Sequence, residues 1–238
     1  MRSRRWWVLG LVTLMISACA ESATSSGPTT SLPPAEVHAE STSMVDTEAP
    51  EPSGVPGLDA PDPLCAAWAA YVGTVQALGI AESFGGLSSD QFATLELTAA
   101  PRLVDVAAEI AASLPAELAG ERTVVNDQRI GPYARRAKTA VEALTAAGVT
   151  PDELNTLSST WQTALLGRDP KAPVLSVPPL ADGLQAKIDA AAIAYDSVVT
   201  PFAQDPSLVV DGVKMPLTAA YLVAHCPDLA SSGVGDAI

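Results

Sequence analysis

Only two histidines, His38 and His225, are available for proton transfer near neutral pH. A Ser/His/Asp triad or a Cys/His nucleophile would have to use one of them. His38 lies in a stretch whose composition predicts disorder, so no catalytic geometry could be held there. His225 directly precedes Cys226, and no Gly-x-Ser-x-Gly motif accompanies it. We therefore expect His225 to pack or cap at the end of a helix, and the sequence predicts no catalytic residue.

Metal and phosphate chemistry also lack their usual residues. A zinc site needs three or four His or Cys ligands, and too few remain if Cys65 and Cys226 are paired. No Asp-x-Asp-x-Asp-Gly calcium loop is present. The glycine-containing stretch SFGGLSSD, residues 83–90, lacks the lysine and spacing of a P-loop, so Ser88 or Ser89 is better interpreted as a helix N-cap. No metal and no cofactor are expected.

Paired carboxylates are the remaining catalytic option, because acidic residues are abundant and any two could meet in space. Sugar clefts usually present several aromatic platforms, but aromatic residues make up only 5% of this chain. Most of them fall on apolar helix faces, where they are expected to form the core. An envelope hydrolase or transferase that uses carboxylates is the alternative function. It predicts two acids converging in a cleft, at least one with a raised pKa.

One cluster of basic residues departs from the acidic background. It supplies five of the ten basic residues that follow position 19, all within seventeen positions. One interpretation is a patch for an anionic ligand or an acidic partner. The other is a solvated face that pairs with Glu121, Asp127 and Glu142. The cluster also contains Arg122, and the candidate patch consists of Arg129, Tyr133, Arg135, Arg136 and Lys138.

The first residues have the layout of a secretory signal peptide. Arg2, Arg4 and Arg5 form a positive region, and the apolar stretch 6–16 ends in small residues before Cys19. This stretch is shorter than the roughly 20 residues needed to span a bilayer.

The four residues Ile16, Ser17, Ala18 and Cys19 resemble the lipobox of bacterial lipoproteins. The resemblance implies that residues 1–18 are cleaved off and that Cys19 is diacylated, which anchors the chain to a bacterial cell membrane on its extracytoplasmic side. Several acyl chains hold a protein firmly, whereas one binds only marginally. An ordinary cleaved signal and an uncleaved anchor are the alternatives. The stretch SRRWW is also similar to a twin-arginine export signal, but the residues after it complete that motif poorly.

Charge and composition then define the segments. The whole chain has a net charge of −14, and cleavage before Cys19 leaves 10 basic and 27 acidic residues, or −17. Nucleic-acid binding is excluded, because it depends on clustered Lys and Arg. Residues 19–60 contain the lipidated cysteine and a Ser/Thr/Pro-rich acidic stretch without Lys, Arg or aromatic residues, which predicts a disordered tether. Residues 61–229 are expected to form one domain, followed by a flexible tail over 230–238.

The periodicity of the domain is helical. Apolar residues spaced by three and four predict helices over 64–78, 103–114, 154–165 and 184–202. Helix starts are indicated by Asp62-Pro63 and by the capping box at 150–153, and a stop by Gly167. Pro101, Pro132 and Pro201 are expected to start or break helices. Residues 207–215 contain an Asp-Gly turn signal and are the one candidate β-hairpin.

Cys65 and Cys226 are the two cysteines that remain if Cys19 is lipidated. In an oxidising compartment they are expected to form a disulfide that joins the ends of the domain. Two buried thiols or a redox pair are the alternatives. The fold class predicted is all-α: a bundle of five or six helices closed by one disulfide, with at most one small β-hairpin, preceded by the disordered tether.

The sequence thus favours a non-catalytic lipoprotein. Its partners would be the membrane, reached through Cys19, and an unknown protein, envelope component or small apolar ligand bound by the helical domain. The anchor motif and the missing catalytic residues together carry this interpretation.

Overall fold

The computed structural model describes residues 54–168, 177–210 and 212–231. The chain divides into two units, 1–47 and 48–238, and all described residues belong to the second. The expected signal peptide, the expected lipidation site Cys19 and the predicted tether up to residue 53 lie outside the described residues, as does the tail from residue 232.

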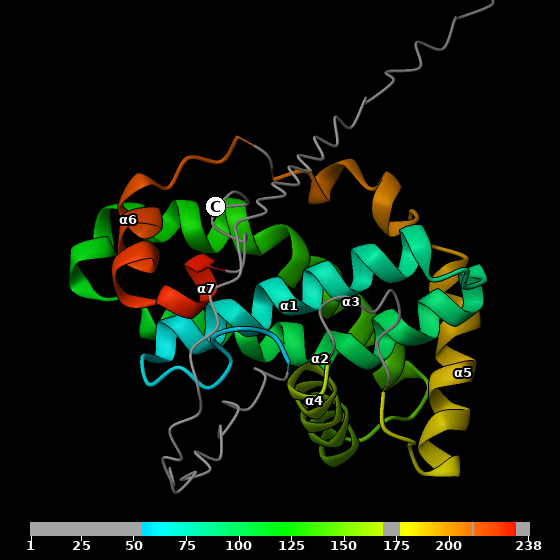
Figure 1. Ribbon diagram of the computed structural model, residues 1–238. Coiled ribbons are helices and arrows are strands. Elements are labelled where there is room, and N and C mark those ends of the chain that lie inside the picture. The colour runs from blue at the N-terminus through cyan, green and yellow to red at the C-terminus, as the bar shows by residue number, and fades with distance from the viewer. Residues whose placement is uncertain (1–53, 169–176, 211, 232–238) are drawn as a thin grey trace, which may run out of the picture. The chain divides into compact units, whose positions relative to one another are not determined.

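Helices account for the architecture, and the all-α prediction is confirmed (Figure 1). The described residues contain seven α-helices, of which α7 has only five residues. They are α1 (Pro63–Phe84), α2 (Ser89–Ser113), α3 (Gly131–Ala146), α4 (Pro151–Leu166), α5 (Asp182–Asp196), α6 (Pro216–His225) and α7 (Pro227–Ser231). Four short helices join them: η1 (Ala116–Glu121), η2 (Val124–Ile130), η3 (Phe202–Gln204) and η4 (Pro206–Leu208).

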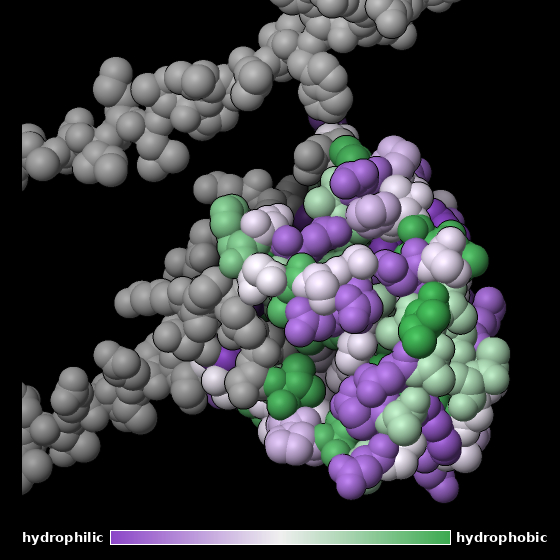
Figure 2. Space-filling model, turned by 90° about the vertical axis from the view of Figure 1, so that its right-hand side faces the viewer, coloured by the Kyte–Doolittle hydropathy of each residue, from purple (hydrophilic) through white to green (hydrophobic). Residues whose placement is uncertain are grey.

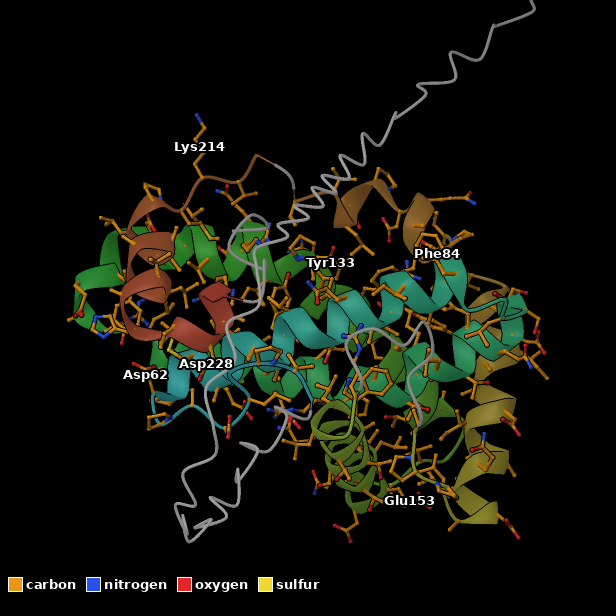
Figure 3. The ribbon with its side chains drawn as sticks, in the orientation of Figure 1. Asp62, Phe84, Tyr133, Glu153, Lys214 and Asp228 are labelled. Carbon is orange, nitrogen blue, oxygen red and sulfur yellow. A yellow bond between two sulfur atoms is a disulfide. The ribbon has the colours of Figure 1, made fainter. Side chains whose placement is uncertain are left out.

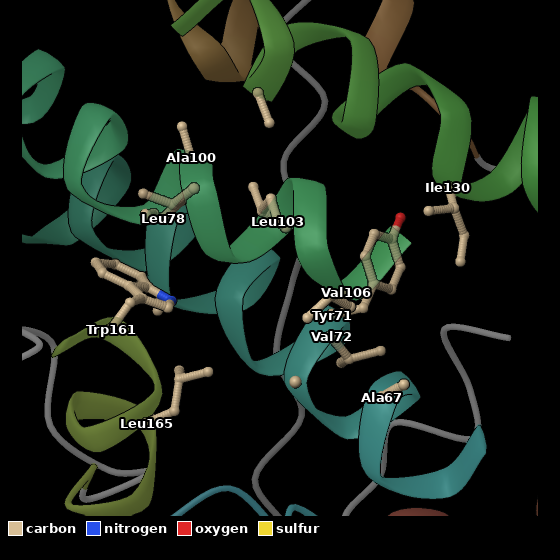
Figure 4. Packing of buried hydrophobic residues seen from close by; sticks show 14 of the residues in the cluster. Ala67, Tyr71, Val72, Leu78, Ala100, Leu103, Val106, Ile130, Trp161 and Leu165 are labelled. Carbon is tan, nitrogen blue, oxygen red and sulfur yellow. The ribbon is translucent and has the colours of Figure 1, made fainter. Parts of the chain in front are cut away.

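Helix α2 is central, because it packs against α1, α3, α4 and α5. The apolar periodicity of the sequence places residues of α1, α2, α4 and α5 in one hydrophobic cluster. Trp161 of α4, Leu78 of α1 and Ala100 of α2 belong to it and are completely or almost completely buried (Figure 4). Trp161 also donates a buried hydrogen bond from Nε1 to Thr74 Oγ1, 2.9 Å long. The same side chain therefore fills the core and fixes the position of α4 on α1.

The predicted helix ends are present. The Asp62 carboxylate caps α1 by accepting hydrogen bonds from the backbone N–H groups of Leu64 and Cys65. Thr150 and Glu153 form the capping box of α4, with distances of 2.8 and 3.3 Å. Ser88 precedes α2 as its N-cap, and Gly167 is the C-cap of α4. These local signals were sufficient to locate the ends because each satisfies backbone groups that the helix itself leaves unpaired.

Helix α1 is long and apolar enough to cross a membrane by length and composition alone. However, 72% of its most apolar window is buried inside the domain. Its apolar residues are therefore explained by its position in the core, where other helices cover it.

The folded domain begins earlier than composition predicted. Residues 54–60 were assigned to the tether, but Val55 and Leu58 are buried in the hydrophobic cluster. The Val55 side chain packs on Gly73, where a Cβ would lie 2.8 Å from it, and the Val55 N–H donates to the Leu165 carbonyl. Two buried aliphatic residues in a Pro- and Gly-rich stretch are too few to show a periodicity, so composition alone misplaced the boundary.

Pro101 lies inside α2, contrary to the expectation that it would start or break a helix. A proline in a helix interior costs about 3 kcal/mol, because one hydrogen bond is lost and the ring crowds the preceding turn. Pro101 is itself buried, and α2 is covered by four other helices. Tertiary packing therefore outweighs the local penalty. Pro132 and Pro201 behave as expected, in the first turn of α3 and directly before η3.

The helix η2 has π-helical geometry, which the sequence did not predict. Val125 and Ile130 are five residues apart and both buried. In an α-helix they would point about 140° apart, since each residue turns the helix by about 100°. A helix with i to i+5 hydrogen bonds brings them close to the same side. The π-helix therefore lets both residues join the hydrophobic cluster.

The chain after α4 differs from the prediction in two places. Helix α5 ends at Asp196 and not at residue 202 as predicted, and Val198, which lies beyond its end, is 77% exposed. Within 207–215, Asp211 lies outside the described residues, and the remaining ones form η4 and a turn, with no strand. Val209 is exposed and Val210 is buried, as in a strand, but no other segment in the described ranges pairs with them.

The predicted disulfide is present between Cys65 in the first turn of α1 and Cys226 between α6 and α7. Their Cα atoms are 5.5 Å apart, an ordinary separation for a disulfide. The bond joins residues 161 positions apart and holds the last two helices against the beginning of the first.

Candidate functional site

Helix α3 divides the predicted basic patch between two settings. Arg136 is part of an inward-facing network, whereas Arg135 and Lys138 are exposed and line a groove on the other side of the helix. Neighbouring residues of an α-helix are rotated by about 100°, so Arg135 and Arg136 cannot share a face. The five residues of the patch are therefore not one continuous surface.

Arg136 connects three helices and a loop. Its Nε and Nη2 atoms donate to the carboxylate of Glu96 in α2, with Nη2 2.9 Å from Oε2. Its Nη1 atom donates to the Thr200 carbonyl at 2.8 Å and to Asp205 Oδ2 at 2.9 Å. The Tyr195 hydroxyl of α5 donates to Glu96 Oε1 at 2.8 Å. We call Glu96, Arg136, Tyr195 and Asp205 the buried network.

Arg136, Tyr195 and Asp205 of the buried network have pKa values shifted toward one protonation state. Burial by itself would lower the pKa of Arg136, but the hydrogen bonds and negative charge of Glu96 raise it above its usual value. Burial and the charge of Glu96 also raise the pKa of Tyr195. Burial opposes ionisation of Asp205, yet hydrogen bonds from Ser207 and Arg136 keep its pKa below the ordinary value. These groups therefore stabilise one another instead of exchanging protons.

Tyr133 of α3 also points into the domain, between α1 and the η3–η4 segment (Figure 3). Its hydroxyl donates to the Leu208 carbonyl at 3.0 Å. Tyr71 makes an edge contact with the Tyr133 ring and donates to the carbonyl of Arg129. Burial raises the pKa of Tyr71 well above its usual value. Tyr133 therefore serves packing, as does the backbone of Arg129.

A pocket of about 240 Å³ beside the buried network has three carboxylates in its lining and is the place to look for the alternative, catalytic arrangement. Glu82, Glu96 and Asp196 line it, together with Phe92 and Phe202. Both Glu96 oxygens already accept hydrogen bonds from Arg136, and Glu82 accepts one from the Ala203 N–H at 2.6 Å. Glu82 and Glu96 are therefore engaged in structural contacts, which argues against either acting as a general base.

The carboxyl pKa values that shift clearly in the described domain all shift downward, whereas a carboxylate acid catalyst needs an upward shift. Glu121 illustrates the cause, because its carboxylate accepts from the N–H groups of Leu217 and Thr218 and from the Thr218 hydroxyl. These bonds keep its pKa low against the effect of burial, and they cap the N-terminus of α6. The shifted carboxyls are Asp62, Asp90, Glu121, Glu153 and Asp205.

His225 has the packing role that the sequence predicted. It is the last residue of α6, is exposed, and stacks on the Tyr221 ring with 4.3 Å between centroids. The Tyr221 hydroxyl donates to Asp62 Oδ2 at 2.6 Å, which raises the Tyr221 pKa to about 12. Asp62, Tyr221 and His225 are thus close together, but the histidine is stacked on the tyrosine ring and not aligned for proton transfer.

The groove beside Arg135 and Lys138 is the part of the predicted patch that stays open. It has a volume of about 480 Å³ and lies between η2, α2 and α3. The ion pairs found within the described ranges include neither Arg135 nor Lys138, and none of them uses Glu121, Asp127 or Glu142, the acids expected to neutralise the patch. We call the groove lined by Arg135 and Lys138 the cationic groove.

The remaining surface offers fewer chemical possibilities. No group of three or more His, Cys, Asp or Glu residues that could hold a metal ion occurs in the described ranges. A second groove, of about 520 Å³, lies where α1, α2 and α4 meet, and Arg102 and Glu109 pair with each other along it. On the face that carries α5, apolar side chains are scattered among hydrophilic ones (Figure 2).

Comparisons with known proteins add no family and no relative. No protein-family model matches the chain, and searches of curated proteins and of solved structures find no significant match. The candidate site therefore depends on its own geometry. Sequence reasoning found Arg135, Arg136 and Lys138 but missed Glu96, Tyr195 and Asp205. The hydrogen bonds of the buried network join residues that lie 40 to 99 positions apart in the sequence, and no local pattern links them.

Proposed function

We propose that this protein is a bacterial lipoprotein, anchored on the extracytoplasmic side of a membrane through Cys19, whose helical domain binds a ligand or partner without catalysing a reaction. The observation that carries the proposal is the Cys65–Cys226 disulfide. Structural disulfides form in oxidising compartments and are rare in the cytosol. Export through the signal sequence and a disulfide in the mature domain are therefore consistent with each other.

Binding without catalysis is supported by how the polar residues are used. The buried carboxylates Glu96 and Glu121 are saturated by hydrogen bonds within the fold, and His225 stacks on Tyr221. The surface grooves of about 480 and 520 Å³ fall in the range of volumes of small-molecule sites. A tether ahead of the domain would keep these grooves close to the membrane and raise their effective concentration there.

Intact mass spectrometry of the membrane-extracted chain tests the proposal, with the Cys19→Ala variant as the matched control. We expect cleavage before residue 19, a mass increment of several acyl chains, and a two-proton deficit that reductant removes. The Cys19→Ala variant should lose the acyl increment and leave the membrane fraction, while it keeps the disulfide. An unmodified Cys19 in the membrane-extracted chain would contradict the anchor.

A further inference from the structure

The cationic groove combines an apolar floor with two exposed cations on one wall. Val104, Ala107 and Ala108 of α2 and Ala134 of α3 provide small apolar surfaces along it. Arg135 and Lys138 are three residues apart on α3, so they lie on the same helix face. The Arg135 head group lies over Gly131, since its Nη1 atom would be 3.0 Å from a Cβ at that position. The floor and the cations therefore face the same open volume.

Most other basic side chains of the described domain are used within it. Arg102 pairs with Glu109, Lys187 pairs with Glu153, and Arg136 belongs to the buried network. Arg122 donates to the Ala111 and Leu114 carbonyls at the end of α2. Acidic residues far outnumber basic ones in this domain, yet Arg135 and Lys138 form no ion pair in the described ranges. Two neighbouring unpaired cations in such a domain suggest a role in binding.

The opposite wall of the groove is the π-helix η2. Asn126 and Asp127 of η2 line the groove. Residues in π-helical geometry occur frequently at functional sites. Gly131 is required at the junction with α3, because a Cβ there would lie 2.8 Å from the Asn126 carbonyl oxygen. The wall is therefore built from unusual local backbone geometry and a glycine whose replacement would force the backbone to shift.

We propose that the cationic groove binds a small amphiphilic anion: one carboxylate, sulfonate or phosphate monoanion on an apolar body. The inference rests on the proposed binding function and names its ligand class. The planar Arg135 guanidinium can hold such a head group through two hydrogen bonds, and the Lys138 ammonium adds a third donor. The apolar body lies against the alanines of α2 and α3. Asp127 on the facing wall repels a second negative charge, which selects singly charged ligands.

The test uses the mature chain, residues 19–238, with Cys19→Ala so that no acyl chain competes for the groove. The probe is 8-anilinonaphthalene-1-sulfonate, which has one sulfonate on an apolar body and becomes fluorescent when it leaves water. A fluorescence titration gives its Kd. Its neutral analogue, N-phenyl-1-naphthylamine, has nearly the same apolar body without the anion. We expect the sulfonate to bind at least about tenfold more tightly, as one charge-assisted contact of about 1.4 kcal/mol would give.

Two kinds of variant locate the binding. Arg135→Gln with Lys138→Gln should weaken sulfonate binding about tenfold or more and leave the neutral analogue unchanged. Ala108→Phe, which fills the groove without changing charge, should weaken both probes. The matched control is Lys214→Gln, since Lys214 is exposed and projects away from the domain on the segment before α6 (Figure 3). It removes a positive charge elsewhere and should leave both Kd values unchanged.

The outcomes separate this inference from the proposed function. Equal loss of sulfonate binding in Lys214→Gln and in the groove variants, or none in either, overturns the groove as the site. If the native chain proves to be acylated but its Cys19→Ala form fails to bind the sulfonate, only the ligand class is overturned, because the anchor is measured independently. Sedimentation with phosphatidylglycerol vesicles then identifies the source of the anion. If the chain binds vesicles and the double variant does not, the anion is a lipid head group. If the chain binds the sulfonate but not the vesicles, the anion is a free molecule.

Discussion

Arg135 and Arg136 are adjacent in the sequence, yet α3 places them in opposite environments. Arg136 is surrounded by Glu96, Asp205 and a backbone carbonyl, with its side chain only 8% exposed. Arg135 is exposed on the wall of an open groove. Two residues with the same side chain therefore have different roles: Arg136 holds helices together, and Arg135 is open to the groove.

The difference follows from what desolvation demands. A buried guanidinium loses its water and must recover the lost interactions from carboxylates and carbonyls. Arg136 does so with contacts to α2, to Thr200 and to Asp205, which orders the segment after α5. Arg135 keeps its water and needs no such partners. Stability should therefore depend on Arg136, and binding on Arg135.

The largest expected effect comes from removing the buried cation. Arg136→Met should lower the free energy of unfolding by about 3 to 5 kcal/mol, because it leaves Glu96 buried without its counter-charge. Chemical denaturation measures the loss as a lower midpoint at unchanged slope. Glu96→Leu added to Arg136→Met should recover part of it, since no uncompensated charge remains. A loss below about 1 kcal/mol in the single variant would contradict the structural role of Arg136.

Acid should weaken the buried network next. The Asp205 pKa is lower in the folded chain than its ordinary value of 3.8, so the unfolded chain binds more protons near that pH. The stability that Asp205 contributes is complete above the unfolded pKa and is lost as pH falls through the folded pKa. We expect Asp205→Asn to cost about 1 to 2 kcal/mol at pH 6 and less at pH 3. Melting temperatures across this range measure it, and an unchanged pH dependence in the variant would argue against the Asp205–Arg136 contact.

The smallest expected effect on stability is in the cationic groove. Arg135→Gln with Lys138→Gln should change the free energy of unfolding by less than about 0.5 kcal/mol, because both side chains are exposed and form no ion pair within the described ranges. The same denaturation experiment measures it beside Arg136→Met. A loss comparable to that of Arg136→Met would erase the distinction between the two positions.

Local features of the fold could be predicted from the sequence. Asp62 and Thr150 begin helices and Gly167 ends one, through contacts with residues a few positions away that have sequence signatures. The disulfide followed from counting cysteines. Pro101 was misplaced because four packed helices override its local preference, and η2 was missed because a five-residue spacing fits neither the helical nor the strand period.

The candidate site was predictable only in part. The cluster of basic residues was visible in the sequence, but its division depended on which face of α3 meets α2 and α5. Glu96 and Tyr195 decide that division, and they join Arg136 only after the helices pack. One interpretation of the sequence pairs Glu121 with the basic cluster, whereas the structure shows that it caps α6, 96 positions further along the chain.

The disulfide has a consequence for resistance to proteases. Cys65 and Cys226 enclose almost the whole folded chain, so a protease that cuts one peptide bond between them produces two pieces that remain covalently joined. Helices α6 and α7 would stay attached to α1 after such a cut, and the nicked molecule would separate only on reduction. A domain built this way tolerates single proteolytic cuts without releasing fragments.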